Sequence, residues 1–350
     1  RIRAVRLLQQ QLLLAADLCV LAGRHACARD DHALARVGDL WRRTQELHPG
    51  LLLLSTSRSA PSFEQVWADK SCVLPRPDVL LLAGGTHIVY RTPAGFESDG
   101  DFAAWLSAPS TGWQRARVAA AAALLIERCQ QRRHVAAATT GMLDSAVRLP
   151  PRVKLDTAKQ QGKHRVRLLV SGGLAAAEAV AEELEELLSD EAARMQQQAS
   201  PLGVWAPSAG QARRAAVSDQ QAHAESHHWG AHPRRPRELA RLRMAWRVLV
   251  YRHVEGGGKA HRSWCALDVV PICAGPAAAQ RHVLLRFGLS PDLVVGFLDA
   301  GGAEPMRSAQ LCGRGSVLVG TRPVADVSNR MQLLSAATDD MPLLLSQKLG

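Results

Sequence analysis

The sequence lacks long apolar runs, paired cysteines and a dense set of aromatic residues. No apolar run reaches the roughly 18 residues that identify a membrane-spanning helix, and the apolar stretch from Ala119 to Ile126 is flanked by charged residues. The seven cysteines show no C-x-x-C spacing, which implies no zinc site and is typical of free thiols in a reducing compartment. Aromatic residues make up 4% of the chain, so a platform for stacking nucleic-acid bases is not indicated.

Positive charge is abundant by contrast. The 350 residues include 43 Lys and Arg against 32 Asp and Glu, which gives a formal net charge of +11. Arginines cluster at the start of the sequence, around Arg128 to Arg133 and from Arg234 to Arg247. Such clusters are typical of a docking surface for RNA or an acidic protein. We expect protein partners in a larger assembly, with RNA as the alternative partner of the arginine-rich stretches.

A polar loop follows one short apolar run. Leucines occupy positions 51 to 54 and lead directly into Ser55, Thr56, Ser57, Arg58 and Ser59. This pattern predicts a buried parallel strand that ends in a polar loop. Ligands of open α/β sheets bind at such carboxyl strand ends. Hydroxyl groups, free backbone N–H groups and a guanidinium together suit a phosphate or sulfate.

Further motifs follow the order of one known family. Leu74, Pro77 and Asp78 come after the loop at similar spacing, and Gly85 to Ile88 reads GTHI. The other matching segments are LLLAAD at Leu12 to Asp17, KHRV at Lys163 to Val166, LDVVP at Leu267 to Pro271 and VVGFLDAGGAEPM at Val294 to Met306. From about residue 7 to about residue 325 the chain resembles the sucrose-phosphate phosphatase family of the haloacid dehalogenase (HAD) superfamily. That domain occurs in free sucrose-phosphatases and as the C-terminal tail of sucrose-phosphate synthases.

The resemblance implies an α/β fold with a Rossmann-like core, in which helices flank a parallel sheet, and an inserted α+β cap. We expect the core in residues 1–90 and 263–350, the cap in residues 91–262, and a low-complexity insert at about residues 199–236. The alternation of strands and helices before residue 90 independently favours a parallel sheet. Four histidines fall in the insert, where we interpret them as part of a polar linker rather than a metal site. Helices are expected over residues 33–47, 62–68, 112–131 and 175–198, and short strands over 166–170, 247–251 and 317–319.

The resemblance also implies which site residues are retained. Asp17 stands at the position of the family's nucleophilic aspartate, and Asp299 at that of its first metal-binding aspartate. In this chain both are read as vestigial. The residues expected to keep a vestigial phosphate or sugar-phosphate site are Thr56, Ser57, Arg58, Ser59 and His164.

Of the positions that depart from the family pattern, four bear most directly on its chemistry. Cys19 replaces the general acid/base aspartate and Leu21 a threonine, while Pro276 replaces the lysine and Ala303 the second metal-binding aspartate. A thiol makes weak hydrogen bonds and is a poor proton donor, and loss of a positioned acid/base costs about 10²–10⁴-fold in rate. Proline carries no charge, and Asp17 and Asp299 alone leave the octahedral shell of Mg²⁺ short of carboxylate. We expect no catalytic residues, no metal site and no cofactor.

Three functions follow from these departures. The first is a catalytically inactive HAD-fold pseudoenzyme that serves as a structural or assembly subunit of a larger complex. The second is a regulatory domain or partner in sucrose metabolism that binds a sugar phosphate. The third is a residual phosphatase that uses Asp17, Asp299 and Mg²⁺. Charge and a first residue other than methionine favour an organelle, a plastid ahead of a mitochondrion, with the cytoplasm as the alternative.

Overall fold

The computed structural model describes residues 12–17, 35, 38–39, 41–46, 50–140, 149–158, 161–199, 245–252, 264–299, 304–313, 315–319 and 331–334. Two compact units are distinguished, one made of residues 1–185 and 245–350 and the other of residues 186–244. The elements below belong to the first unit, except that α7 continues into the second. The low-complexity insert at 199–236 and its histidines fall almost entirely outside the described residues.

An eight-stranded sheet forms the core. Its order is β12-β11-β10-β1-β2-β3-β4-β5, and the strands from β12 to β3 are all parallel. β4 and β5 continue the sheet as antiparallel neighbours. The strand bounds are β1 Leu12–Asp17, β2 Gly50–Ser55, β3 Val79–Leu82, β4 His87–Thr92, β5 Gly95–Ser98, β10 Val294–Asp299, β11 Gly315–Val319 and β12 Met331–Leu334. The predicted α/β fold with a mostly parallel sheet is confirmed.

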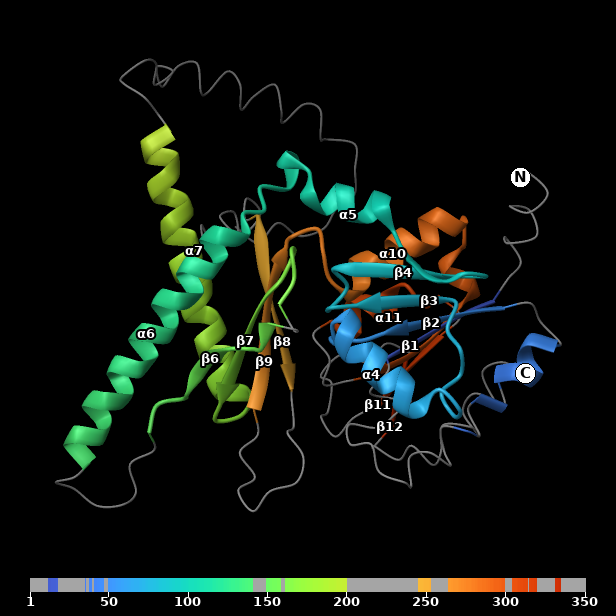
Figure 1. The fold of residues 1–350 in the computed structure, drawn as a ribbon, viewed down its shortest axis with the longest axis horizontal. Coiled ribbons are helices and arrows are strands. Elements are labelled where there is room, and N and C mark those ends of the chain that lie inside the picture. Colours follow the sequence, from blue (N-terminus) through green and yellow to red (C-terminus); the bar gives the residue numbers. More distant parts are fainter. Residues whose placement is uncertain are drawn as a thin grey trace, which may run out of the picture. The chain divides into compact units, whose positions relative to one another are not determined.

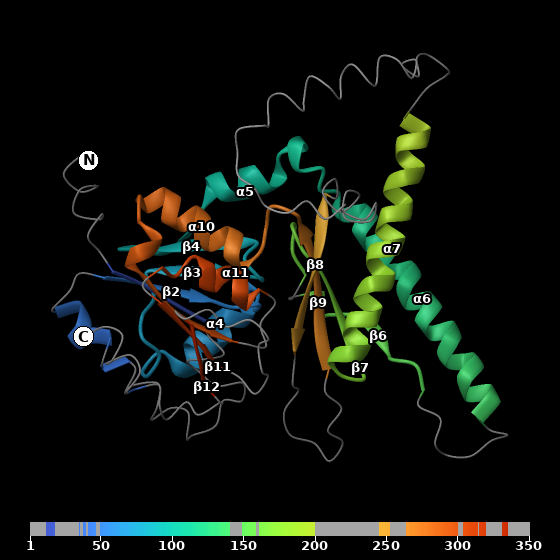
Figure 2. The same ribbon diagram turned by 180° about the vertical axis from the view of Figure 1, so that it is seen from behind.

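Helices cover both faces of this sheet, which explains why its central strands are apolar throughout. Figures 1 and 2 show α4 (Ala60–Lys70) on one face and α10 (Pro276–Phe287) and α11 (Pro305–Gln310) on the other. Leu52, Leu53 and Leu54 of β2 are each at most 1% exposed. The helix predicted over residues 33–47 is present in its described part, where residues 35, 38–39 and 41–46 are helical.

A second, four-stranded sheet has the order β6-β7-β9-β8 and is antiparallel throughout. Its strands are β6 Val153–Leu155, β7 Val166–Ser171, β8 Trp246–Arg252 and β9 Trp264–Pro271. Figures 1 and 2 show α6 (Arg115–Thr140) and the first part of α7 (Leu174–Ala199) along one face of this sheet. Its other face carries Leu249 and Val270, which belong to one buried cluster with Leu13, Leu53 and Leu81 of the large sheet.

Two expected boundaries are corrected by the strand pairing. The core sheet extends beyond residue 90, because β4 and β5 stay in it as far as Ser98. At the other end, β9 pairs with β7 and β8 rather than with a core strand, so the second sheet reaches Pro271. The chain therefore returns to the core after Pro271 and not at residue 263.

The helix expected from Gly112 is α6, and it begins at Arg115. The residues before it, Pro109 to Thr111, form a separate 3-10 turn.

Asp99 connects the helices of the core around the end of β5. Its buried carboxylate caps α5 (Gly100–Ser107) by accepting the backbone N–H of Phe102 at 2.9 Å. It also accepts the Tyr90 hydroxyl at 2.8 Å, and it pairs with Arg286 of α10 at 2.9 Å. Burial by itself would raise the pKa of Asp99, but hydrogen bonds from Phe102, Tyr90 and His282 and the charge of Arg286 lower it overall.

Candidate functional site

The carboxyl ends of three core strands bring the predicted site positions together. Asp17 ends β1 and is paired in register with Ser55, the last residue of β2. Asp299 ends β10, the neighbour of β1 on the other side, where Ala16 pairs with Phe297. Parallel strands end at the same edge of a sheet, so the backbones of Asp17, Ser55 and Asp299 share one edge. The side chains of Asp17 and Asp299, and all of Cys19, Leu21 and Ala303, lie outside the described residues.

The polar loop after β2 is tied to the end of β3 by its backbone. The N–H of Thr56 donates to the carbonyl of Leu81 at 2.8 Å, and the N–H of Ala83 donates to the carbonyl of Arg58 at 2.7 Å. The hydroxyl of Thr56 accepts the N–H of Arg58 at 3.2 Å. Ser59 precedes α4 as its N-cap residue and is 6% exposed, whereas Arg58 is exposed. The loop is therefore an ordered turn, and backbone hydrogen bonds to the end of β3 fix its conformation.

The turn directly after β3 has a left-handed backbone and is hydrogen-bonded to this loop. Ala83, Gly84 and Gly85 have φ values of 54°, 66° and 76°. A Cβ on Gly85 would lie 2.3 Å from the carbonyl carbon and oxygen of Gly275. Glycine is required here both for the left-handed conformation and for the close approach of the segment that leads into α10.

Two arginines of the second region bind the loop at the carbonyl group of Ser57. Arg165, which directly precedes β7, and Arg167 within it each donate from Nη1 to the carbonyl oxygen of Ser57, at 2.7 and 2.8 Å. Arg165 is completely buried and Arg167 is 6% exposed. Two guanidinium groups on one carbonyl hold the loop against the cap sheet with charge-assisted hydrogen bonds.

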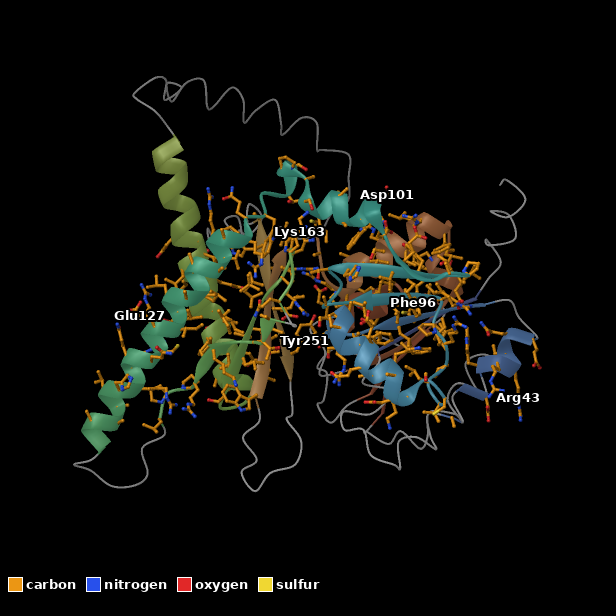
Figure 3. All side chains as sticks on the ribbon, in the orientation of Figure 1. Arg43, Phe96, Asp101, Glu127, Lys163 and Tyr251 are labelled. Carbon is orange, nitrogen blue, oxygen red and sulfur yellow. The ribbon has the colours of Figure 1, made fainter. Side chains whose placement is uncertain are left out.

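Asp268 of β9 supplies the opposite charge. Its Oδ1 lies 3.1 Å from Nε of Arg167, and its Oδ2 lies 3.5 Å from Nη1 of Arg165, with Asp268 itself completely buried. Burial lowers the pKa of Arg165 while the carboxylate of Asp268 opposes that shift. Tyr251 of β8 completes the group, and burial followed by the charge of Asp268 raises the pKa of its phenol. Figure 3 shows Tyr251 between the second sheet and the core sheet.

A second buried ion pair lies beside the start of α10. Nη1 of Arg247, on β8, donates to Oε1 of Glu304 at 2.6 Å, and Glu304 also pairs with Arg307 at 3.2 Å. A Cβ on Gly275 would lie 2.0 Å from Nη2 of Arg247. The guanidinium therefore lies directly against the residue before Pro276. Burial lowers the pKa of Arg247, and the charge of Glu304 opposes that shift.

Pro276 opens α10, where its ring suits the first helical turn and its missing N–H costs nothing. A cation from another element lies beside the residue that precedes it. This cation is Arg247 of β8, in the second sheet. Arg247 was expected on an exposed basic docking surface. The structure corrects this for Arg247, whose side chain is 13% exposed and is paired with Glu304. Residues 234–244 of that stretch lie outside the described residues.

His164 lies just before β7 and is 7% exposed. Its Nε2 lies 2.9 Å from the hydroxyl of Ser107 at the end of α5, so the ring is held by a core-side helix. Burial, followed by the charge of Lys163, lowers the pKa of His164. The ring is neutral at physiological pH and does not supply a positive charge to the site.

The buried Arg165, Arg167, Asp268, Arg247 and Glu304 were not predicted as a cluster from the sequence. A signal was present, since Arg165 and Arg167 alternate within a strand and Asp268 interrupts an apolar run. Magnesium would require oxygens at this edge, and the sequence offers Asp17 and Asp299 with alanine at position 303. One or two carboxylates with water can hold Mg²⁺, but the side chains of Asp17 and Asp299 lie outside the described residues, so no chemical step is derived through a metal. The expectation that the chain binds no metal stays a prediction.

Comparisons with known proteins agree with this architecture. Residues 10–138 match the family model described as sucrose-6F-phosphate phosphohydrolase. The structure is similar to that of the sucrose-phosphatase from Synechocystis sp. in complex with sucrose and phosphate, with a TM-score of 0.55 and 14% sequence identity over 97% of this chain and 98% of that one. No curated protein sequence matches the chain.

Two other solved structures align over comparable lengths. A haloacid dehalogenase-like hydrolase protein of Bacillus subtilis gives a TM-score of 0.47 at 12% identity, covering 97% of this chain and 93% of its own. A trehalose-6-phosphate phosphatase of Aspergillus fumigatus gives 0.43 at 12% identity, covering 99% and 97%. Residues 10–138 therefore match the sucrose-6F-phosphate phosphohydrolase family model, and the fold of the chain is similar to that of a sucrose-phosphatase.

Proposed function

We propose that this chain is a catalytically inactive HAD-fold protein that serves as a structural subunit of a larger complex. The observation that carries the proposal is the state of the cation beside α10. The resemblance places Pro276, the first residue of α10, where the family has its lysine, and the neighbouring Arg247 donates to the buried carboxylate of Glu304 at 2.6 Å. A cation paired in this way is not free to neutralise a transferring phosphoryl group, which is the main electrostatic requirement of that chemistry.

The fixed position of the second sheet supports the same proposal. Arg165 and Arg167 hold the Ser57 carbonyl, and a hydrogen bond from a charged donor contributes about 1.5–3 kcal/mol. A cap that must open to admit substrate would have to break such contacts in every cycle. Retaining them suits a protein whose shape matters more than its turnover.

Identification of the proteins or RNA that bind this chain tests its proposed role as a subunit of a complex. The basic composition, with a net charge of +11, favours an acidic protein or RNA surface, and an organelle, a plastid ahead of a mitochondrion, is the compartment that we propose. Affinity purification of the tagged chain from its native source should co-purify a fixed set of partners at constant stoichiometry. Elution as a monomer with no stoichiometric partner, at low and physiological salt, would contradict a subunit role.

A second function, binding of a sugar phosphate without hydrolysis, is favoured by the intact loop after β2. Thr56 and Arg58 are held in a turn by Leu81 and Ala83, so the loop is preorganised for an anion. Calorimetry with sucrose 6-phosphate tests this function, with Arg58→Gln as the control, because Arg58 is exposed and its loss leaves the buried pairs intact. Absence of heat at millimolar ligand would remove the sugar-phosphate alternative and leave the structural role unaffected.

A further inference from the structure

A cavity of about 330 Å³ lies at the opposite edge of the core sheet. It is lined on one side by the helical residues 35, 38, 39, 41, 42 and 45, and on the other by residues 71–76, which lead into β3. β2 and β3 begin at Gly50 and Val79, so this is the amino edge of the parallel strands. The polar loop at residues 55–59 follows the carboxyl end of β2, and the cavity is therefore separate from the candidate site. Its volume falls within the range of about 300–1,000 Å³ for small-molecule sites.

The side chains around the cavity present more hydrogen-bond donors than acceptors. Arg42, Arg76 and Arg91 line it together with Trp41. Trp41 is only 3% exposed, and its Nε1 has no hydrogen-bond partner within the described residues. A buried indole N–H without an acceptor is costly, which indicates that an acceptor from outside the described chain satisfies it.

Arg91 is held in place for binding. It pairs with Oδ1 of Asp78, and Oδ2 of the same carboxylate accepts the backbone N–H of Leu52 at 2.9 Å. Arg42 pairs with Asp39 on its own helix. Arg76 forms no ion pair with any described carboxylate. One guanidinium is thus positioned at the cavity by a fixed carboxylate, and a second is uncommitted beside it.

The remaining wall is apolar. Val73, Leu74 and Pro75 line it opposite the helix. The helix approaches this segment closely through Gly38, where an added Cβ would lie 3.3 Å from the carbonyl oxygen of Val73. Cys72 also lines the cavity and has an exposed free thiol. An apolar wall with an aromatic ring and converging arginines suits a ligand with an anionic group and a flat apolar part.

We propose that this cavity is a binding site for a small organic anion. The phosphate or carboxylate group of the ligand binds Arg76 and Arg91, its apolar part lies against Trp41 and Leu74, and an oxygen accepts the Trp41 Nε1–H. The site does not depend on the proposed function of the chain, because it shares no residue with the loop at 55–59.

Phenyl phosphate tests the site in the full chain, with inorganic phosphate and phenol as its two separate halves. The rate of Cys72 alkylation by iodoacetamide, followed by peptide mass spectrometry, reports on the cavity itself. At a phenyl phosphate concentration ten times Kd we expect Cys72 to react about tenfold more slowly, because only the ligand-free fraction reacts. Cys273, which lies in the segment before α10 and outside this cavity, should react at an unchanged rate.

Variants separate this cavity from the candidate site. Arg76→Gln, on an exposed residue, should weaken phenyl phosphate binding by about tenfold or more, as expected for loss of a charge-assisted hydrogen bond. Trp41→Phe keeps an aromatic ring but removes the indole N–H, and should also weaken binding, with circular dichroism confirming that the variant folds. Arg58→Gln should leave the protection of Cys72 intact. The proposal is overturned if about 10 mM phenyl phosphate gives no protection, if Arg76→Gln is protected like wild type, or if Arg58→Gln abolishes protection.

Discussion

Nη1 of Arg165, a fully buried residue that directly precedes β7 of the second sheet, lies 2.7 Å from the carbonyl oxygen of Ser57 in the loop after β2. This hydrogen bond connects the two sheets at the edge where the polar loop begins. Asp268 balances the charge of Arg165 at 3.5 Å and is itself completely buried. The contact between the loop and the second sheet therefore depends on one buried ionic group.

Arg165→Gln should lower the free energy of unfolding by about 3–5 kcal/mol, because it leaves Asp268 buried with a weaker partner. Asp268→Asn should cost a similar amount, and the double variant should cost clearly less than the sum. Urea denaturation measures all three. Arg76→Gln serves as a surface control that should stay within about 0.5 kcal/mol of wild type. Additive effects of the two buried substitutions would show that the pair is not coupled.

Asp99 should make the stability of the core depend on pH in acid. The pKa of Asp99 in the folded protein lies below its ordinary value of 3.8, so its contribution to stability is complete above that pH and is lost as pH falls through the folded-state pKa. Asn at this position keeps the helix cap and removes the charge. Asp99→Asn should be less stable than wild type by about 2–3 kcal/mol at pH 7.

The difference between Asp99→Asn and wild type is measured by denaturant unfolding from pH 7 down to pH 2. Other carboxylates titrate in both proteins and cancel in the difference. The gap should narrow as pH falls below the ordinary aspartate range. A gap that stays constant across the whole range would mean that the charge of Asp99 does not stabilise the fold.

Gly275 and Gly95 form a matched pair for testing the crowding around Arg247. Their φ values are 126° and 129°, but a Cβ on Gly95 meets nothing within 4 Å, whereas on Gly275 it meets Nη2 of Arg247 at 2.0 Å. Both substitutions to alanine should carry a strain cost of about 1–3 kcal/mol. Gly275→Ala should cost about 1–3 kcal/mol more through overpacking.

Thermal and urea unfolding of the two alanine variants measure this difference. If the excess cost comes from Arg247, adding Arg247→Ala to Gly275→Ala should recover part of it, while adding it to Gly95→Ala should not. Equal costs for the two glycine substitutions would place Arg247 elsewhere and remove the observation on which the proposed function rests.

Much of the core could be predicted from local sequence, because its strands are short apolar runs that end in polar loops. Leu51 to Ser59 shows this most clearly, and the structure has β2 and its loop at those residues. The run from Trp264 to Pro271 was expected in the core because the resemblance implies a core from residue 263 onward, yet it pairs with β7 and β8. An apolar pattern predicts a buried strand, but it does not specify which sheet the strand joins.

The charged cluster shows a second limit of prediction from sequence. Arginine is almost always exposed unless it is paired, so Arg247 was expected on a basic surface. Its partner, Glu304, lies 57 residues away and is brought to it only by the packing of β8 against the segment before α11. The resemblance predicts that Pro276 replaces the family's lysine. The position of Arg247 beside this residue could be found only from the structure.

Phosphate release from sucrose 6-phosphate in the presence of Mg²⁺ directly tests whether the chain is catalytically inactive, with Asp17→Asn as the matched control. We expect wild type and Asp17→Asn to release phosphate at the same background rate, with no dependence on Mg²⁺. Release by wild type that requires Mg²⁺ and disappears in Asp17→Asn would contradict it, because the retained aspartate would then be acting as a nucleophile.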